Sequence, residues 1–157
     1  KKLKATIAFR KEFKADESRL SFYEENPNED MVKFREDMEK QVEKGFMYVK
    51  GIDKKNRALL RLDLGRVQAP WDLTPYVQNH MYHYDRALAC TERRTNGAED
   101  KINAIVSFQD YGMKNQPPLA NDRAVMTYFG LHWPERLDKA FFVNVPFIFR
   151  LFFKLIQ

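Results

Sequence analysis

L-H-W-P-E-R-L-D-K-A-F-F-V-N-V-P-F-I-F-R-L-F-F-K-L-I-Q, residues 131–157, is the stretch from which the fold of this protein is most readily inferred. It begins with a compact turn in which Glu135 and Arg136 stand side by side after a proline. The apolar run that follows, residues 140–145, has the length and composition of a buried strand. Pro146 then suits the first position of a helix, where its missing N–H would be unpaired anyway. This last segment is too short to cross a bilayer, which needs about 20 apolar residues, so we expect it to join the core or to meet lipid.

The composition indicates one globular domain with a substantial core, since 44% of the 157 residues are apolar and 31% are charged. The net charge of +5 favours anionic surfaces, although such an excess is also common in proteins that bind nothing acidic. The single cysteine, Cys90, excludes a disulfide framework and favours a reducing compartment. The sequence carries no recognisable signal peptide or transmembrane span. Because it begins without Met and stops inside an apolar segment, we expect a C-terminally truncated piece of a longer protein.

The first 44 residues are predicted to form an N-terminal helical segment. Residues 1–15 alternate apolar side chains with lysine and arginine, as in a basic amphipathic helix. Such a helix suits either a membrane surface or an ordinary solvated surface, and the pattern leaves both readings open. A second helix is predicted over residues 29–43, ending at Gly45.

From residue 45 onward, strand-like and helix-like patterns alternate. Thr74 and Pro75 provide the expected N-cap and first residue of a long helix that ends at Asn96 and Gly97. The alternation predicts an α/β domain with a mostly parallel mixed sheet flanked by helices. The expected strands span residues 46–49, 58–64, 102–108 and 140–145, and the expected helices between them span residues 74–96 and 121–132.

A catalytic centre is not evident from the sequence. His80 and His83 are spaced to share a metal, but no third ligand is near them and His80 falls on an apolar stripe, which favours core histidines. Ser107 lacks the G-x-S-x-G elbow of hydrolases, and Cys90 lies within a helix. Asp110 ends a central strand, where α/β enzymes place functional groups, but it also suits a turn cap. We therefore expect no enzyme activity, no metal, no cofactor and no nucleic-acid partner.

Two motifs near the C-terminus carry a resemblance to a known family. Residues 132–139, H-W-P-E-R-L-D-K, are similar to Y-P-E-R-L-G-K of the CRAL-TRIO lipid-binding domain, with Trp133 in place of Tyr and Asp138 in place of Gly. Residues 143–149, V-N-V-P-F-I-F, are similar to the I-N-A-P-x-x-F of the same family. The separation of the two motifs also matches.

Two weaker motifs occur earlier in the same order. Residues 51–57 resemble the family's G-x-D-x-x-G-R-P-V, with Asn56 in place of Gly and Ala58 in place of Pro. Asp110 and Gly112 resemble its D-x-G turn. The four motifs together make the chain similar to the secretory phosphatidylinositol-transfer type of CRAL-TRIO domain.

The resemblance covers residues 45–157 and implies a lipid pocket under a mobile gate helix, which residues 150–157 would begin. Glu135 matches the family glutamate of a polar bridge near the gate. Ser107 matches a family threonine that contacts choline lipids, whereas Ile105 stands where the family has the serine of that pair. The loss of that serine weakens the resemblance to a phosphatidylcholine binder.

The predicted function is therefore binding, and transfer between membranes, of a hydrophobic ligand, foremost a phosphoinositide or another phospholipid. We expect a cytoplasmic protein in peripheral contact with membranes. The open alternatives are a carrier of an isoprenoid such as a retinoid or tocopherol, a protein-interaction module without lipid cargo, and a hydrolase using Ser107 and Asp110. The candidate ligand contacts are polar groups at one end of the pocket and aromatic walls elsewhere, namely Ser107, Glu135, Tyr84, Phe108, Phe142, Phe149 and Phe153.

Overall fold

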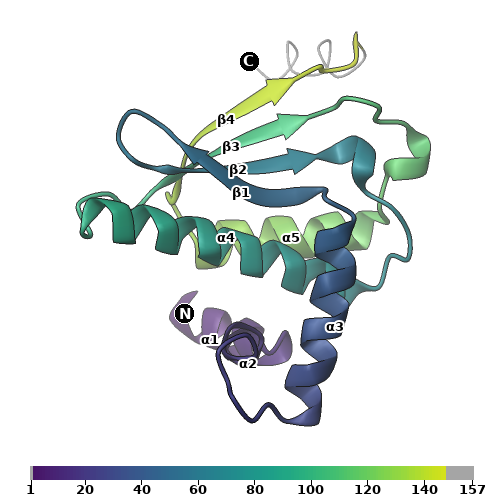
Figure 1. Ribbon diagram of the computed structural model, residues 1–157. Helices are drawn as coiled ribbons and strands as arrows, with labels where there is room; N and C mark the ends of the chain where they lie inside the picture. Colours follow the sequence, from purple (N-terminus) through teal and green to yellow (C-terminus); the bar gives the residue numbers. More distant parts are fainter. Residues whose placement is uncertain (1, 148–157) are drawn as a thin grey trace.

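A four-stranded sheet forms the centre of the computed structural model, which describes residues 2–147 (Figure 1). The strand order is β1-β2-β3-β4, with β1 antiparallel to β2 and the other neighbours parallel. The predicted mostly parallel mixed sheet is confirmed. The strands are β1 (Met47–Ile52), β2 (Ala58–Asp63), β3 (Ile102–Ser107) and β4 (Leu137–Val143).

Three helices precede the sheet: α1 (Lys2–Glu12), α2 (Ala15–Leu20) and α3 (Glu29–Glu43). The predicted N-terminal helical segment is thus confirmed, but the first helix ends at Glu12 because Lys14 has a positive φ of 48°. Asn28 caps α3, since its side chain accepts a hydrogen bond from the N–H of Met31 at 2.9 Å.

The two parallel crossovers run through α4 (Leu73–Thr95) and α5 (Leu119–His132), with short 3-10 turns η1 (Leu64–Arg66) and η2 (Met113–Asn115) at the carboxyl ends of β2 and β3. The prediction that Thr74 caps α4 is wrong. Asp72 is the last residue with extended backbone, so helical geometry begins one residue before Thr74. Asn96 ends α4 as predicted, in the left-handed conformation at φ 51°.

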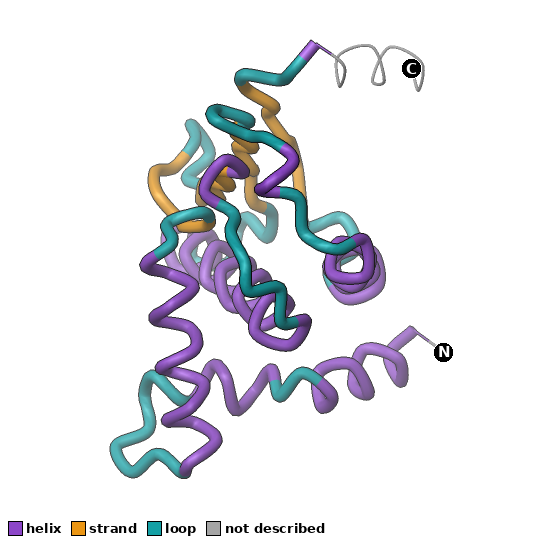
Figure 2. The backbone as a smooth tube through the Cα atoms, turned by 90° about the vertical axis from the view of Figure 1, so that its right-hand side faces the viewer, coloured by secondary structure: helices purple, strands orange, loops and turns teal. Residues whose placement is uncertain are grey.

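The molecule has three layers: the sheet, then α4 and α5, then α1 and α2 on the side away from the strands (Figures 1 and 2). The buried stripe of α4 packs against the strands because its apolar residues recur at helical spacing, and Val77 and Ala87 are completely buried. Met47, Leu60 and Ile102 supply the sheet's share of this core. Within residues 2–147, no helix lies over the opposite face of the sheet (Figure 1).

The strand β4 differs from the buried strand that its composition predicts. It spans Leu137–Val143 rather than residues 140–145, and all seven of its residues are exposed. The reason is its position at the end of the strand order, where β3 is its only neighbour among the described strands. An apolar strand is buried only when other parts of the fold cover both of its faces, and the strand's own sequence does not show whether they do.

Candidate functional site

The open face of the sheet is divided into a polar half and an apolar half. The register aligns Tyr48 of β1, Arg61 of β2, Ile105 of β3 and Phe141 of β4 in one row across the strands. Residues in one row share a face, and the alternating residues form the core against α4. Polar side chains therefore occupy the β1–β2 half of this row, and apolar side chains occupy the β3–β4 half.

The polar half is organised around the carboxylate of Asp63, which adjoins Arg61 on the same face. The Tyr48 hydroxyl donates to Asp63 Oδ2 at 3.2 Å, and Arg61 Nε donates to Asp63 Oδ1 at 2.9 Å. The Arg61 guanidinium also lies 6.0 Å from the centre of the Tyr48 ring. Burial, followed by the negative charge of Asp63, raises the pKa of the Tyr48 hydroxyl. This trio offers hydrogen-bond donors with little net charge.

The apolar half carries large side chains that solvent reaches. Phe141 is 49% exposed and Val143 is 39% exposed, while Ile105 between β2 and β4 is partly buried. Exposed apolar surface adjoining a few polar groups is the usual composition of a ligand site. The sequence reasoning missed Phe141, Arg61 and Tyr48. The alternation in A-L-L-R-L-D of β2, which puts Arg61 and Asp63 on one face, is the signal that could have found the polar half.

The candidate Ser107 lies at the carboxyl end of β3, on the open face, and is 2% exposed. Its Oγ accepts a hydrogen bond from the N–H of Gln109 at 3.3 Å, which holds the turn after the strand. The Nδ1 atoms of His80, His83 and His132 all hydrogen-bond elsewhere, to main-chain oxygens of α4 or to a threonine hydroxyl. His80 and His83 are buried on α4, on the other side of the sheet from the open face, and among the described residues no histidine hydrogen-bonds to Ser107 Oγ.

The candidate Glu135 lies at the other end of the sheet. The parallel register pairs Leu137 with Ile102 and Val143 with Ser107, so Glu135 precedes the amino end of β4. At about 3.3 Å per strand residue, the length of the strand separates it from Ser107. The prediction that these two side chains form one polar end is therefore wrong. Glu135 is exposed and adopts a positive φ of 63° in the turn before β4.

The aromatic candidates lie on the helix side of the sheet or outside the described residues. Tyr84 is 3% exposed in the core, with its ring centre 4.7 Å from that of Phe129, and burial raises the pKa of its hydroxyl to about 12. Phe142 pairs with Val106 on the helix side of the sheet but is itself 47% exposed, and its ring centre lies 6.4 Å from that of Phe108. The remaining candidates, Phe149 and Phe153, fall outside residues 2–147.

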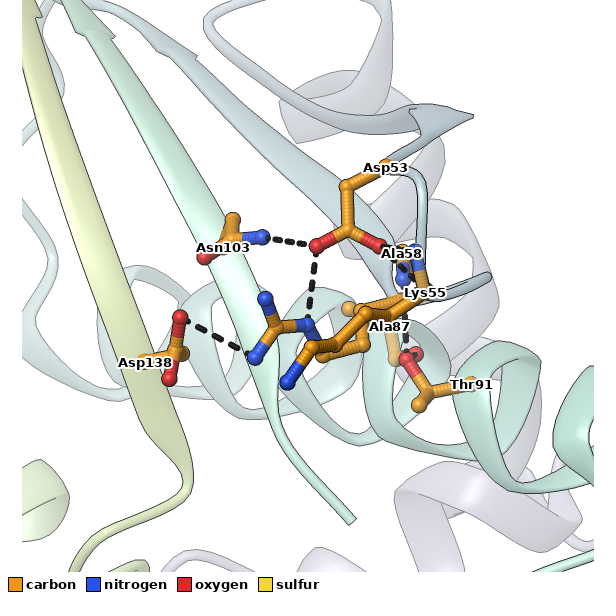
Figure 3. Close-up of polar contacts among 8 residues, drawn as sticks. Asp53, Lys55, Ala58, Ala87, Thr91, Asn103 and Asp138 are labelled. Atoms are coloured by element: carbon orange, nitrogen blue, oxygen red, sulfur yellow. Dashed lines mark hydrogen bonds and ion pairs between the residues drawn. The ribbon is translucent and has the colours of Figure 1, made fainter. Parts of the chain in front are cut away.

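The G-x-D-x-x-N-R loop between β1 and β2 forms a buried polar network rather than a ligand site (Figure 3). Arg57 is 7% exposed, and its Nε donates to Asp53 Oδ2 at 2.8 Å while Nη1 contacts Asp138 Oδ2 at 3.0 Å. Asn103 of β3 also donates to Asp53, at 2.8 Å. Burial by itself would raise the pKa of Asp53, but hydrogen bonds from Arg57 and from the Lys55 N–H lower it to about 2.

The same network fastens the loop to α4 and explains a departure from the family motif. The N–H of Ala58 donates to Thr91 Oγ1 at 2.9 Å, and this hydroxyl in turn reaches the Ala87 carbonyl at 3.3 Å (Figure 3). Asn56 occupies the motif's glycine position with φ 61°. Asparagine tolerates this left-handed conformation better than other residues with a side chain, so the turn is kept.

Arg136 of the P-E-R turn has a structural role. Its Nη1 donates to the Asp100 carbonyl at 2.9 Å and lies 3.3 Å from Asp100 Oδ2 and 3.7 Å from Glu92 Oε1. These contacts tie the turn before β4 to the carboxyl end of α4 and to the loop that leads into β3.

The comparison with known families agrees with this geometry. The family model of the CRAL/TRIO domain matches residues 42–157, which is most of the chain. The chain belongs to the CRAL-TRIO family. CRAL-TRIO domains bind lipophilic small molecules, and this domain presents the open sheet face described above. Within residues 2–147, no cluster of His, Cys, Asp and Glu has the arrangement of a metal site. No helix in that part of the CRAL-TRIO chain is long and apolar enough to span a membrane.

Proposed function

We propose that this CRAL-TRIO domain binds a phospholipid, in the first place a phosphoinositide, against the open sheet face and transfers it between membranes. The observation that carries the proposal is the row from Phe141 and Ile105 to Arg61 and Tyr48, which joins an apolar surface to hydrogen-bond donors. With strands about 4.8 Å apart, the row is long enough for an acyl segment at one end and a head group at the other. The gate helix that the family resemblance implies would begin in residues 150–157, outside the described part of the chain.

Affinity on such a face needs no catalytic group. Each buried CH₂ group contributes about 0.8 kcal/mol, so a chain of several methylenes over Phe141, Ile105 and Val143 supplies a useful binding energy. Specificity then depends on the few polar groups at the end of the row. We propose accordingly that the domain acts as a carrier and not as an enzyme, which agrees with the engagement of Ser107 by the Gln109 N–H.

A carrier of a neutral isoprenoid alcohol is the second candidate. The charge of Arg61 is already paired with Asp63 at 2.9 Å, so a phosphate would have to compete with a carboxylate for the guanidinium. A hydroxyl head group needs only one of the donors that the trio presents. The two candidates therefore differ in whether Asp63 helps or hinders binding.

We also propose peripheral contact with cytoplasmic membrane surfaces through α1. Leu3 is 72% exposed and Ile7 is 47% exposed, one turn apart on this helix, and Lys4 and Lys11 of the same helix are also exposed. Apolar side chains flanked by lysines suit the interface of an anionic bilayer. The buried side of α1 packs by Phe9 against the helix layer, so the outer side is available.

Transfer of lipid between vesicles tests the carrier function, with two phenylalanine variants as a matched pair. Phe141→Gln alters the open face, whereas Phe142→Gln alters the other face of the same strand at nearly equal exposure, 49% against 47%. We expect Phe141→Gln to slow transfer of fluorescent phosphatidylinositol from phosphatidylcholine vesicles several-fold, while Phe142→Gln leaves the rate close to wild type. Equal rates for wild type and both variants would contradict a ligand on the open face. Absence of transfer and of co-purified lipid by native mass spectrometry would favour the protein-interaction module.

A further inference from the structure

A cavity lies on the far side of α4 from the sheet. This cleft, which we call the arginine cleft, has a volume of about 800 Å³ and is lined mainly by α1, α2, α4, the end of α5 and the turn before β4. Its walls belong to the second and third layers of the molecule, so α4 separates it from the open sheet face (Figures 1 and 2). The volume falls within the usual range for small-molecule sites.

Arginine side chains from four parts of the chain converge on the cleft. The five arginines that line the cleft are Arg10, Arg19, Arg86, Arg93 and Arg136. Two of them are already in ion pairs, Arg10 with Asp16 at 2.6 Å and Arg136 with Asp100 at 3.3 Å. Among residues 2–147, no carboxylate forms an ion pair with the remaining three arginines.

The acidic side chains of the lining do not balance this charge. Only Asp85 and Glu92 are acidic, and Glu92 lies 3.7 Å from Arg136. Asp85 is partly buried between charges from two helices, Arg10 of α1 and Arg19 of α2. Positive charge that is gathered in a concave, partly desolvated space attracts anions more strongly than the same charge spread over a surface.

Other features of the lining provide surfaces for a ligand besides its charges. Met81, Leu88 and the indole of Trp133 form apolar wall, and the Arg10 guanidinium lies 5.7 Å from the centre of the Trp133 ring. His132 Nε2 is buried, and none of the described residues forms a hydrogen bond with it.

We propose that the arginine cleft binds a small molecule that carries several phosphate groups, either free in solution or as a lipid head group. Guanidinium groups bind phosphate through paired N–H donors, and several arginines on different helices suit several phosphates better than one. A ligand bridging Arg19 of α2 and Arg93 of α4 would also fasten the N-terminal helices to the rest of the domain. The site is independent of the open sheet face and of the proposed carrier function.

Isothermal titration with inositol hexakisphosphate at physiological ionic strength tests this proposal. The test variant is Arg19→Gln/Arg93→Gln, in which both side chains are exposed, so the fold is expected to persist. The control is Lys33→Gln/Arg123→Gln, which removes the same charge outside the cleft lining. We expect the test variant to bind about tenfold more weakly and the control to bind within about twofold of wild type.

The source of the phosphates is distinguished with vesicles. Sedimentation with phosphatidylcholine vesicles, with and without phosphatidylinositol bisphosphate, is compared with the titration of the soluble probe. Weaker binding by the test variant than by the control supports the cleft in either assay. Weaker binding of the soluble probe indicates a free ligand. Weaker binding to vesicles alone indicates a lipid head group. Equal weakening of the test variant and the control would overturn the proposal, because binding would then follow net charge. Absence of wild-type binding in both assays would overturn it as well.

Discussion

Arg57 and Asp138 meet at 3.0 Å and join the loop between β1 and β2 to the edge strand β4 (Figure 3). Asp138 stands where the resembled family motif has glycine, so this chain has a carboxylate at a position where the motif provides none. The pair extends the contact of Arg57 with Asp53 across β3, whose Asn103 binds the same Asp53. One buried guanidinium thereby connects the loop between β1 and β2 to β4 directly and to β3 through Asp53.

Replacing Arg57 should cost much more stability than replacing Asp138. Arg57→Gln leaves Asp53 without its buried partner, and loss of one member of a buried ion pair costs about 3–5 kcal/mol. The side chain of Asp138 is 25% exposed, so Asp138→Gly should cost about 1 kcal/mol or less. Urea unfolding followed by circular dichroism measures both changes. Equal losses would show that Asp138, and not Asp53, is the main partner.

Gly65 should tolerate no side chain. A Cβ at this position would lie 2.1 Å from the carbonyl oxygen of Gln109 and 2.9 Å from the carbonyl carbon of Asp110, both main-chain atoms. Gly65→Ala should therefore destabilise the domain by about 3 kcal/mol or more, because backbone must move. Gly130, within α5, has no atom within 4 Å of the same position, so Gly130→Ala should stabilise by about 0.5–1 kcal/mol. Thermal unfolding of the two variants gives the comparison, and similar midpoints would refute the close approach at Gly65.

His80 should make the domain sensitive to acid. Burial lowers the pKa of its imidazole from 6.5 to about 4, although the main-chain hydrogen bond to Tyr76 acts in the opposite direction. The unfolded chain therefore binds a proton at higher pH than the folded chain, and stability falls as the pH drops from 6.5 towards 4. His80→Phe keeps a ring against Phe46 and should remove up to about 3 kcal/mol of this dependence. Urea unfolding at several pH values checks it; an unchanged slope in the variant would count against a neutral buried His80.

Asp85 should have the opposite effect on stability. Burial raises the pKa of its carboxyl to about 6, and the nearby Arg10 and Arg19 only partly offset this. The folded state then holds the proton more tightly than the unfolded state, so the contribution of Asp85 to stability declines as the pH rises from 3.8 to about 6. Asp85→Asn should stabilise the domain at pH above this range by on the order of 1–2 kcal/mol after solvent screening, with little effect at lower pH. Guanidinium unfolding on both sides of the range measures the difference, and destabilisation on the alkaline side would contradict it.

Asp63→Asn should shift the choice of ligand on the open face. Without the carboxylate, the Arg61 guanidinium is free to pair with a phosphate, so binding of phosphatidylinositol should strengthen several-fold relative to a neutral isoprenoid alcohol. Asp37→Asn is the control, since it removes a carboxylate that lies 3.5 Å from Lys40 on α3, away from the sheet. Competition between the two ligands, read by native mass spectrometry, measures the ratio. The same ratio in wild type and Asp63→Asn would exclude Arg61 from head-group recognition.

The sequence alone determined the family and the order of most of the helices and strands, because these depend on local patterns; the short helix α2 was not predicted. Periodicity of 3.6 residues predicted α3 and α4, and Asn96 marked the end of α4 through its tolerance of a left-handed backbone. The placement of His80 on an apolar stripe predicted a core histidine, and that side chain is 4% exposed. The P-E-R and N-V-P motifs indicated the CRAL-TRIO family, because such motifs are short contiguous sequences that can be recognised without the structure.

Only the tertiary structure decided which side chains share a surface. The sequence of a strand does not show which of its faces other elements will cover. The sequence therefore suggested Phe142 as a ligand contact, whereas Phe141 is the residue on the open face. Parallel pairing placed Ser107 and Glu135 at opposite ends of the sheet, and the edge position of β4 left it exposed. The arginine cleft is assembled from helices distant in sequence, and its charge becomes concentrated only when those helices pack. Burial and electrostatics depend on three-dimensional proximity, which local patterns do not contain.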